Sequence, residues 1–165
     1  MLKKVRVLIK TKQYKVKDTL FDGAPVTDAE IDNEPEELEM MMEGSYHDDG
    51  TRISISYREG EITGMKNTRT TLSFHKSEPM LISMIRDGSV RTALFFEEGK
   101  RHISLYETPF MPFELAVKTK RIKNRIEENG MLTLDYTVEL KGASAEHTDF
   151  SLQLLPHITK PLADS

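Results

Sequence analysis

Five polar side chains form the best candidate for a functional site in this sequence: Arg91, His102, Ser104, Tyr106 and Thr108. The planar guanidinium of an arginine matches a carboxylate, and a tyrosine hydroxyl can donate a hydrogen bond beside it. A buried charge without a partner is costly. If Arg91 and Tyr106 face a cavity, we therefore expect them to bind an anionic or carboxylate-bearing ligand.

Two other interpretations of this cluster stay open. In a structural role, Arg91 keeps its stem buried and its head in water, Tyr106 makes one internal hydrogen bond, and His102 is a satisfied core histidine. In a third interpretation, His102 is a general base or a haem ligand, although its own strand carries no carboxylate to orient it.

Recognisable catalytic and metal-binding motifs are absent from the sequence. It contains no GxSxG, P-loop or GxGxxG pattern and no cysteine. The histidines, at positions 47, 75, 102, 147 and 157, form no HxH or HExxH pair. A metal site could therefore assemble only from distant strands. We assign no catalytic residue, metal ligand or cofactor.

The elements that carry the cluster are predicted to be strands. Apolar and polar residues alternate in 5–9, 53–57 and 132–140, a pattern typical of strands with one buried face. The segment 35–44, PEELEMMMEG, also favours a strand. Residues 18–34 are rich in Asp, Pro and Gly and predict a long loop with at most one helical turn, whereas 156–165 predict a loose tail.

Short turns set the predicted register of the strands between Met80 and Thr119. A two-residue turn at Asp87-Gly88 pairs Met84 with Arg91, and a turn at Glu98-Gly99 sets Arg91 opposite Tyr106. An even-length turn near Phe110 sets Tyr106 opposite Leu115, whereas a three-residue loop would reverse the last strand. The five-residue cluster then shares one face with Met80, Ile82, Met84, Ala93, Phe95, Phe113, Leu115 and Val117.

The opposite face of these strands is apolar and predicts a covering partner. It holds Leu81, Ile85, Leu94, Phe96, Ile103 and Leu105, too many apolar groups for the surface of a monomer. We expect this face to form a homodimer or to be covered by residues 18–34.

Length and composition predict one globular domain, residues 1–155. The chain has 165 residues, of which 38% are hydrophobic and 30% charged. A net charge of −4 argues against nucleic acid as the main partner. No apolar run is long enough for a signal peptide or a membrane span, and the lack of cysteine fits a reducing compartment, so we expect a cytoplasmic location without a membrane partner.

Charge is distributed unevenly near the amino terminus. Residues 1–20 carry seven Lys and Arg, whereas residues 22–49 contain acidic residues and no Lys or Arg. Two neighbouring strands with complementary charges explain this distribution, and a polyanion site is the alternative.

Three segments carry a resemblance to a known family. They are GKRHISLYETPF (99–110), ITGMKNTRTTLSF (62–74) and IRDGS (85–89). They resemble the YwiB-like family of small bacterial proteins over nearly the whole chain. The resemblance implies an all-β fold: a closed antiparallel up-and-down barrel of about 8–10 strands, calycin-like and related in shape to lipocalins. It implies no activity, so no catalytic residue is transferred.

Three functions remain as hypotheses. As a binding module, our preferred hypothesis, the barrel holds a small amphipathic or anionic ligand, with Arg91 and Tyr106 at its head and Met80, Ile82, Met84, Phe95 and Leu115 along its apolar part. As an interaction protein, it has a filled core and acts through its outer surface. As an enzyme, it would use His102 or Tyr106.

Overall fold

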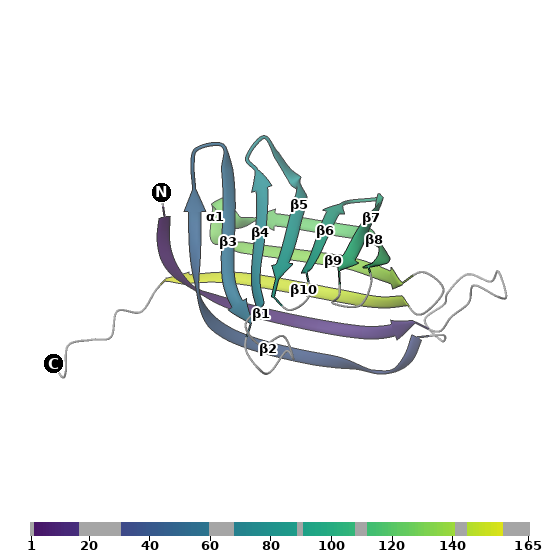
Figure 1. Ribbon diagram of the computed structural model, residues 1–165. Helices are drawn as coiled ribbons and strands as arrows, with labels where there is room; N and C mark the ends of the chain where they lie inside the picture. The colour runs from purple at the N-terminus through teal and green to yellow at the C-terminus, as the bar shows by residue number, and fades with distance from the viewer. Residues whose placement is uncertain are drawn as a thin grey trace, which may run out of the picture.

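The computed structural model describes residues 2–16, 31–59, 68–88, 91–107, 112–140 and 145–156, which form a closed antiparallel barrel (Figure 1). Each strand pairs with its sequence neighbours, and the first also pairs with the last, which confirms the predicted fold class. The ten strands in these ranges are β1 (Leu2–Val16), β2 (Ile31–Asp48), β3 (Arg52–Glu59), β4 (Thr68–His75), β5 (Glu78–Asp87), β6 (Arg91–Glu97), β7 (Arg101–Glu107), β8 (Pro112–Arg125), β9 (Met131–Leu140) and β10 (Ala145–Pro156).

Strand β1 closes the barrel by pairing with both β2 and β10. The basic residues of β1 face the acidic residues of β2: Lys12 Nζ lies 3.3 Å from Glu37 Oε1, and Lys10 is directly opposite Glu39. Opposite charges across neighbouring strands stabilise their pairing. The predicted complementary strands are thus confirmed as the reason for the uneven charge.

Segment 35–44 is part of a strand, as predicted, but that strand begins earlier than expected. Strand β2 starts at Ile31, so the predicted loop over 18–34 was wrong for residues 31–34, which continue the pairing with β1. The rest of that loop and the proposed helical turn lie outside the described residues, as does the predicted tail after Pro156.

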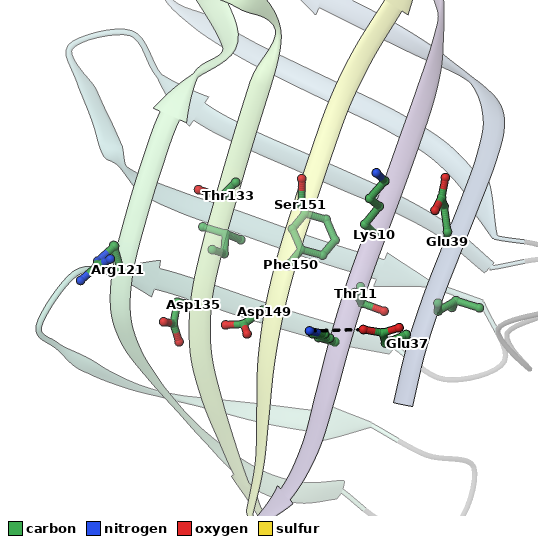
Figure 2. A pocket seen from close by; sticks show the side chains of 13 residues that line it. Lys10, Thr11, Glu37, Glu39, Arg121, Thr133, Asp135, Asp149, Phe150 and Ser151 are labelled. Atoms are coloured by element: carbon green, nitrogen blue, oxygen red, sulfur yellow. Dashed lines mark ion pairs between the residues drawn. The ribbon is translucent and has the colours of Figure 1, made fainter. Parts of the chain in front are cut away.

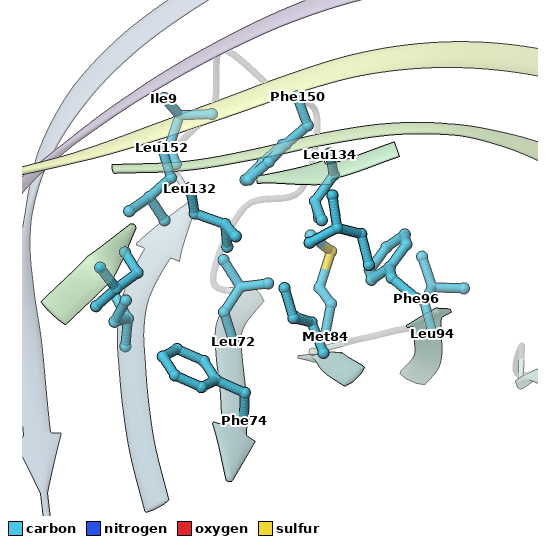
Figure 3. Packing of buried hydrophobic residues seen from close by; sticks show 14 of the residues in the cluster. Ile9, Leu72, Phe74, Met84, Leu94, Phe96, Leu132, Leu134, Phe150 and Leu152 are labelled. Carbon is cyan, nitrogen blue, oxygen red and sulfur yellow. The ribbon is translucent and has the colours of Figure 1, made fainter. Parts of the chain in front are cut away.

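Apolar side chains from opposite walls meet inside the barrel (Figure 3). Leu132 and Leu152, from β9 and β10, point toward Leu72 of β4, and Leu134 points toward Met84 of β5. A single helical turn, α1 (Ile126–Asn129), connects β8 to β9 and adds the buried Ile126 to this core. The apolar part of the interior is therefore filled by side chains.

The predicted pairing of β5 with β6 was wrong. Asp87 faces Arg91 and Met84 faces Leu94, so the connection has three residues instead of two. Gly88 packs closely against β4: a Cβ at this position would lie 2.5 Å from Thr68 Oγ1, which leaves no room for a larger residue unless Thr68 moves. Because one extra residue reverses the faces of a strand, Arg91 and Phe95 are exposed on the outer surface.

The Glu98-Gly99 turn is confirmed, but the pairing that it was expected to set is not. Lys100 N donates to Glu97 O at 3.0 Å, and Gly99 has a φ of 78°. Between the turn and the first described pairs, the β7 side has one residue more than the β6 side, so Thr92 instead of Arg91 faces Tyr106. This second one-residue shift returns β7 to its predicted orientation.

Strand β8 has the predicted orientation with a different partner. Tyr106 faces Phe113, not Leu115, and four residues separate the paired Glu107 and Pro112. The connection is therefore of even length, and Leu115 and Val117 are buried as predicted.

The outer surface over β5, β6 and β7 carries some of the apolar residues that were predicted to lie there. Leu81, Ile85 and Ile103 are exposed, and the exposed fraction of Ile103 is 58%. Leu94 and Phe96 were wrongly placed there and lie in the core. The side chain of Leu105 lies outside the described residues. Among the described residues, no helix is long and apolar enough to cross a membrane.

Replacing Gly44 with Ala should destabilise the barrel where β2 passes between β1 and β3. A Cβ at this position would lie 2.7 Å from Ser56 O and 2.8 Å from Val7 Cγ2. We expect the free energy of unfolding in urea to fall by about 1–3 kcal/mol. The neighbouring Ser45→Ala should change it by less than about 0.5 kcal/mol; equal stability of Gly44→Ala and the wild type would contradict this packing.

Candidate ligand-binding site in the barrel interior

A row of inward-facing polar residues crosses four strands of the barrel. Tyr57 of β3 is opposite Thr70 of β4, Thr70 is opposite Arg86 of β5, and Arg86 is opposite Thr92 of β6. We call these four residues the inner polar row. The adjacent inward positions on the same strands are apolar: Ile55, Leu72, Met84 and Leu94. The interior therefore changes from apolar to polar within two residues along each strand.

Arg86 forms an incomplete ion pair with Glu59, the next inward residue after Tyr57 on β3. Arg86 Nη2 lies 3.7 Å from Glu59 Oε1, which is too long for a hydrogen bond. The Glu59 side chain is only 4% exposed and that of Arg86 27%. Within the described residues, Arg86 Nε and Glu59 Oε2 are buried and have no hydrogen-bond partner. Inside the barrel, Arg86 can therefore donate a further hydrogen bond and Glu59 can accept one.

Two buried hydroxyl groups of the inner polar row are also unpaired. Tyr57 Oη and Thr70 Oγ1 have no partner with hydrogen-bond geometry among the described residues. Burial raises the pKa of the Tyr57 hydroxyl well above its usual range, although the positive charge of Arg86 opposes this shift. Burial likewise raises the pKa of Tyr136 on β9. At neutral pH both tyrosines therefore remain potential hydrogen-bond donors.

A cavity of about 410 Å³ adjoins these groups. It is lined by Tyr57, Glu59 and Arg86, by the further polar residues Thr11, Gln13, Glu36 and Glu37, and by the apolar residues Ile9, Leu38, Met40 and Phe150. Its volume falls within the range of small-molecule sites, which usually combine apolar walls with a few polar groups. The arrangement can bind a polar head group beside an apolar segment.

Of the five residues proposed from sequence, the three whose side chains are described, Arg91, His102 and Ser104, do not line this cavity. Arg91 lies on the outer surface because of the three-residue connection before β6. Ser104 is buried, and its Oγ has no partner among the described residues. Tyr106 has its backbone opposite Thr92 of the inner polar row, but its side chain and all of Thr108 lie outside the described residues.

His102 is half-buried and contacts a carboxylate from the neighbouring strand. Its Nε2 lies 3.0 Å from Glu97 Oε1, and its ring centroid is 6.3 Å from that of Phe95. The Glu97 carboxyl has its pKa lowered, chiefly by this hydrogen bond. Sequence reasoning found no carboxylate on the strand of His102; the structure supplies one across the Glu98-Gly99 turn.

The residues missed by sequence reasoning carry a readable signal. Arg86 follows the inward Ile82 and Met84 by simple alternation, and Glu59 follows the inward Tyr57 in the same way. Extending the alternation to the ends of β3 and β5 would have placed both charges inside.

Comparison with known proteins identifies the family of the chain. Residues 26–152 match the family described as "Domain of unknown function (DUF1934)". The chain belongs to this family. It is 27% identical over 119 residues to the "Uncharacterized beta-barrel protein YwiB" of Bacillus subtilis (strain 168), covering 72% of this chain and 80% of that protein. The resemblance to a YwiB-like family is confirmed.

A solved structure supports the same fold. The crystal structure of ywiB protein from Bacillus subtilis aligns with a TM-score of 0.60 at 15% sequence identity, and the alignment covers 92% of this chain and 94% of that one. At this identity the likeness concerns the fold alone. The polar interior must therefore be interpreted from the residues of this chain.

Alkaline pH should destabilise the protein through its buried tyrosines. Above pH about 10, tyrosines of the unfolded chain lose their protons while Tyr57 and Tyr136 keep theirs, so the folded state binds more protons and stability falls as pH rises. In Tyr57→Phe, the urea midpoint should fall less between pH about 9 and about 11. Thr70→Val removes no ionisable group, so its urea midpoint should fall with pH as steeply as that of the wild type. An equally steep fall in Tyr57→Phe would contradict the raised pKa of Tyr57.

Proposed function

We propose that this protein binds a small amphipathic or anionic molecule inside the barrel, without catalysing its conversion. The observation that carries the proposal is the set of unpaired buried groups beside the cavity: Arg86 Nε, Tyr57 Oη and Glu59 Oε2. A buried polar group without a hydrogen bond costs about 1–3 kcal/mol. A ligand that pairs with these groups would recover that free energy on binding.

The atoms that lack partners define the head group of the ligand. Arg86 and Tyr57 offer donors, so the ligand needs an acceptor such as a carboxylate, whereas Glu59 Oε2 needs a donor such as a hydroxyl or ammonium group. The remaining part of the ligand would lie against Leu38 and Met40. A carboxylic acid with a nearby hydroxyl or amino group and a short apolar chain fits this chemistry.

The site of the ligand differs from the one expected from sequence, although the chemistry is the same. The expected arginine and tyrosine donors are supplied by Arg86 and Tyr57. The predicted kinship in shape to lipocalins and the cytoplasmic location remain parts of this proposal, since a chain without cysteine suits a reducing compartment.

Native mass spectrometry of protein purified from its own host should detect the ligand. We expect a discrete added mass on the wild-type chain that disappears on denaturation. Arg86→Met and Tyr57→Phe should each lose most of it, because each removes one donor at the cavity. Arg91→Met is the matched control: it removes an exposed arginine and should retain the ligand.

Stability separates this role of Tyr57 from a purely structural one. The Tyr57 hydroxyl interacts with the Thr70 hydroxyl but has no partner with hydrogen-bond geometry among the described residues, so Tyr57→Phe should leave the ligand-free protein equally stable or more stable by about 1 kcal/mol. A clean mass in every charge state of the wild-type protein, or retention of the ligand by Arg86→Met, would contradict the proposal.

Self-association is a second candidate function, favoured by the outer surface of β5, β6 and β7. Ile85, Phe95 and Ile103 are exposed there on neighbouring strands, and a second copy of the chain could cover them. Sedimentation should then give twice the mass of the chain, and Ile103→Lys should give the mass of one. A monomeric wild-type protein would remove this candidate.

A further inference from the structure

We propose that Asp135, His147 and Asp149 bind a divalent transition-metal ion on the outer face of β9 and β10. Asp135 and Asp149 are directly opposite each other in the antiparallel pair, and His147 precedes Asp149 by two residues, so the three side chains share one face. This site is separate from the interior cavity and independent of the function proposed for it.

The three side chains lie close enough together to reach one metal ion. His147 Nε2 lies 2.8 Å from Asp135 Oδ1 and 3.4 Å from Asp149 Oδ1. One ligand atom from each residue lies within 4.8 Å of the others. An ion about 2.0–2.2 Å from nitrogen and oxygen ligands holds neighbouring ligand atoms about 3–3.5 Å apart. Small side-chain rotations would therefore suffice to form three bonds to one ion.

A neighbouring hydroxyl orients the imidazole for this role. Thr137 Oγ1 lies 3.1 Å from His147 Nδ1, and the Tyr14 ring is centred 6.0 Å from the imidazole. Ligating histidines usually bond through their second nitrogen in this way, which fixes the ring and directs the other nitrogen at the metal. Here Nε2 is the nitrogen directed at both carboxylates.

Two carboxylates face each other directly at the site, and on its other side each has a cation opposite it in the sheet, Lys12 for Asp149 and Arg121 for Asp135. Glu37, Lys12, Asp149, Asp135 and Arg121 stand in register across five strands; we call them the charged row (Figure 2). Like charges directly opposite each other destabilise a strand pair. In the described part of the chain, Lys12 forms its ion pair with Glu37, and neither aspartate has a Lys or Arg nitrogen within 4.0 Å.

The position of the site leaves room around the ion. A surface hollow of about 580 Å³ is lined by both aspartates and by the cations Lys10, Lys12 and Arg121. Three protein ligands do not complete the coordination of a transition metal, so water or an anionic group in the hollow would supply the rest. One imidazole with two carboxylates favours Zn²⁺ or a similar ion over Mg²⁺ and Ca²⁺, which prefer oxygen ligands alone.

Calorimetric titration of the full chain with ZnCl₂, after treatment with EDTA, tests the proposal. We expect one ion per chain and at least tenfold weaker binding in His147→Gln and in Asp149→Asn, because each variant loses a ligand. Glu37→Gln is the matched control, since it removes a carboxylate of the charged row that pairs with Lys12. It should stay within twofold of the wild type, as should Arg86→Met at the interior cavity.

Two further readouts exclude a folding defect and adventitious binding. The metal-free Asp149→Asn protein should melt close to the wild type, because the substitution removes a like-charge contact with Asp135 and weakens the contact with His147, and these two effects oppose each other. Zn²⁺ should shift the nitrogen resonance of His147 Nε2 in spectra of the wild-type protein. No zinc binding, wild-type affinity in both ligand variants, or Mg²⁺ binding as tight as Zn²⁺ would overturn the proposal.

Discussion

The alternation of side chains around a closed sheet is the constraint on which the rest of this structure depends. Each strand is paired on both sides, so the face that a residue occupies is fixed by the register of its two neighbours, and the last strand must agree with the first. The charge pairing of β1 with β2 supports this closure from outside. Every apolar row of the core and the inner polar row follow from it.

The interior is divided into a stabilising part and a costly part. Leu72, Met84 and Leu94 and the apolar residues around them exclude water. Within two inward positions of them, the buried Tyr57 and Glu59 and the half-buried Arg86 carry buried atoms without a hydrogen-bond partner among the described residues. Burial of the apolar groups supplies the main driving force for folding, and each unpaired polar atom opposes it. The unpaired polar atoms at this end of the barrel are the observation on which the ligand-binding proposal rests.

Alternation predicted the strands and the resemblance to the YwiB-like family predicted the closed barrel, but neither located the site. Periodicity located the core positions Val7, Ile55 and Leu134, because alternation depends only on local sequence. The face of Arg91 depended on the length of one turn, and the closeness of Gly88 to Thr68 is a contact between strands that no local pattern reveals. Likewise, His147 and Asp135 are on different strands and form no short metal-binding motif in the sequence. Only the register of β9 and β10 brings them together.

A crystal structure of the protein purified from its own host would test the central claim most directly. The account predicts electron density for a bound molecule in contact with Arg86 Nε, Glu59 Oε2 and Tyr57 Oη, and an apolar segment beside Met40. A cavity filled by protein side chains, with those three atoms hydrogen-bonded to one another or to neighbouring residues, would contradict it.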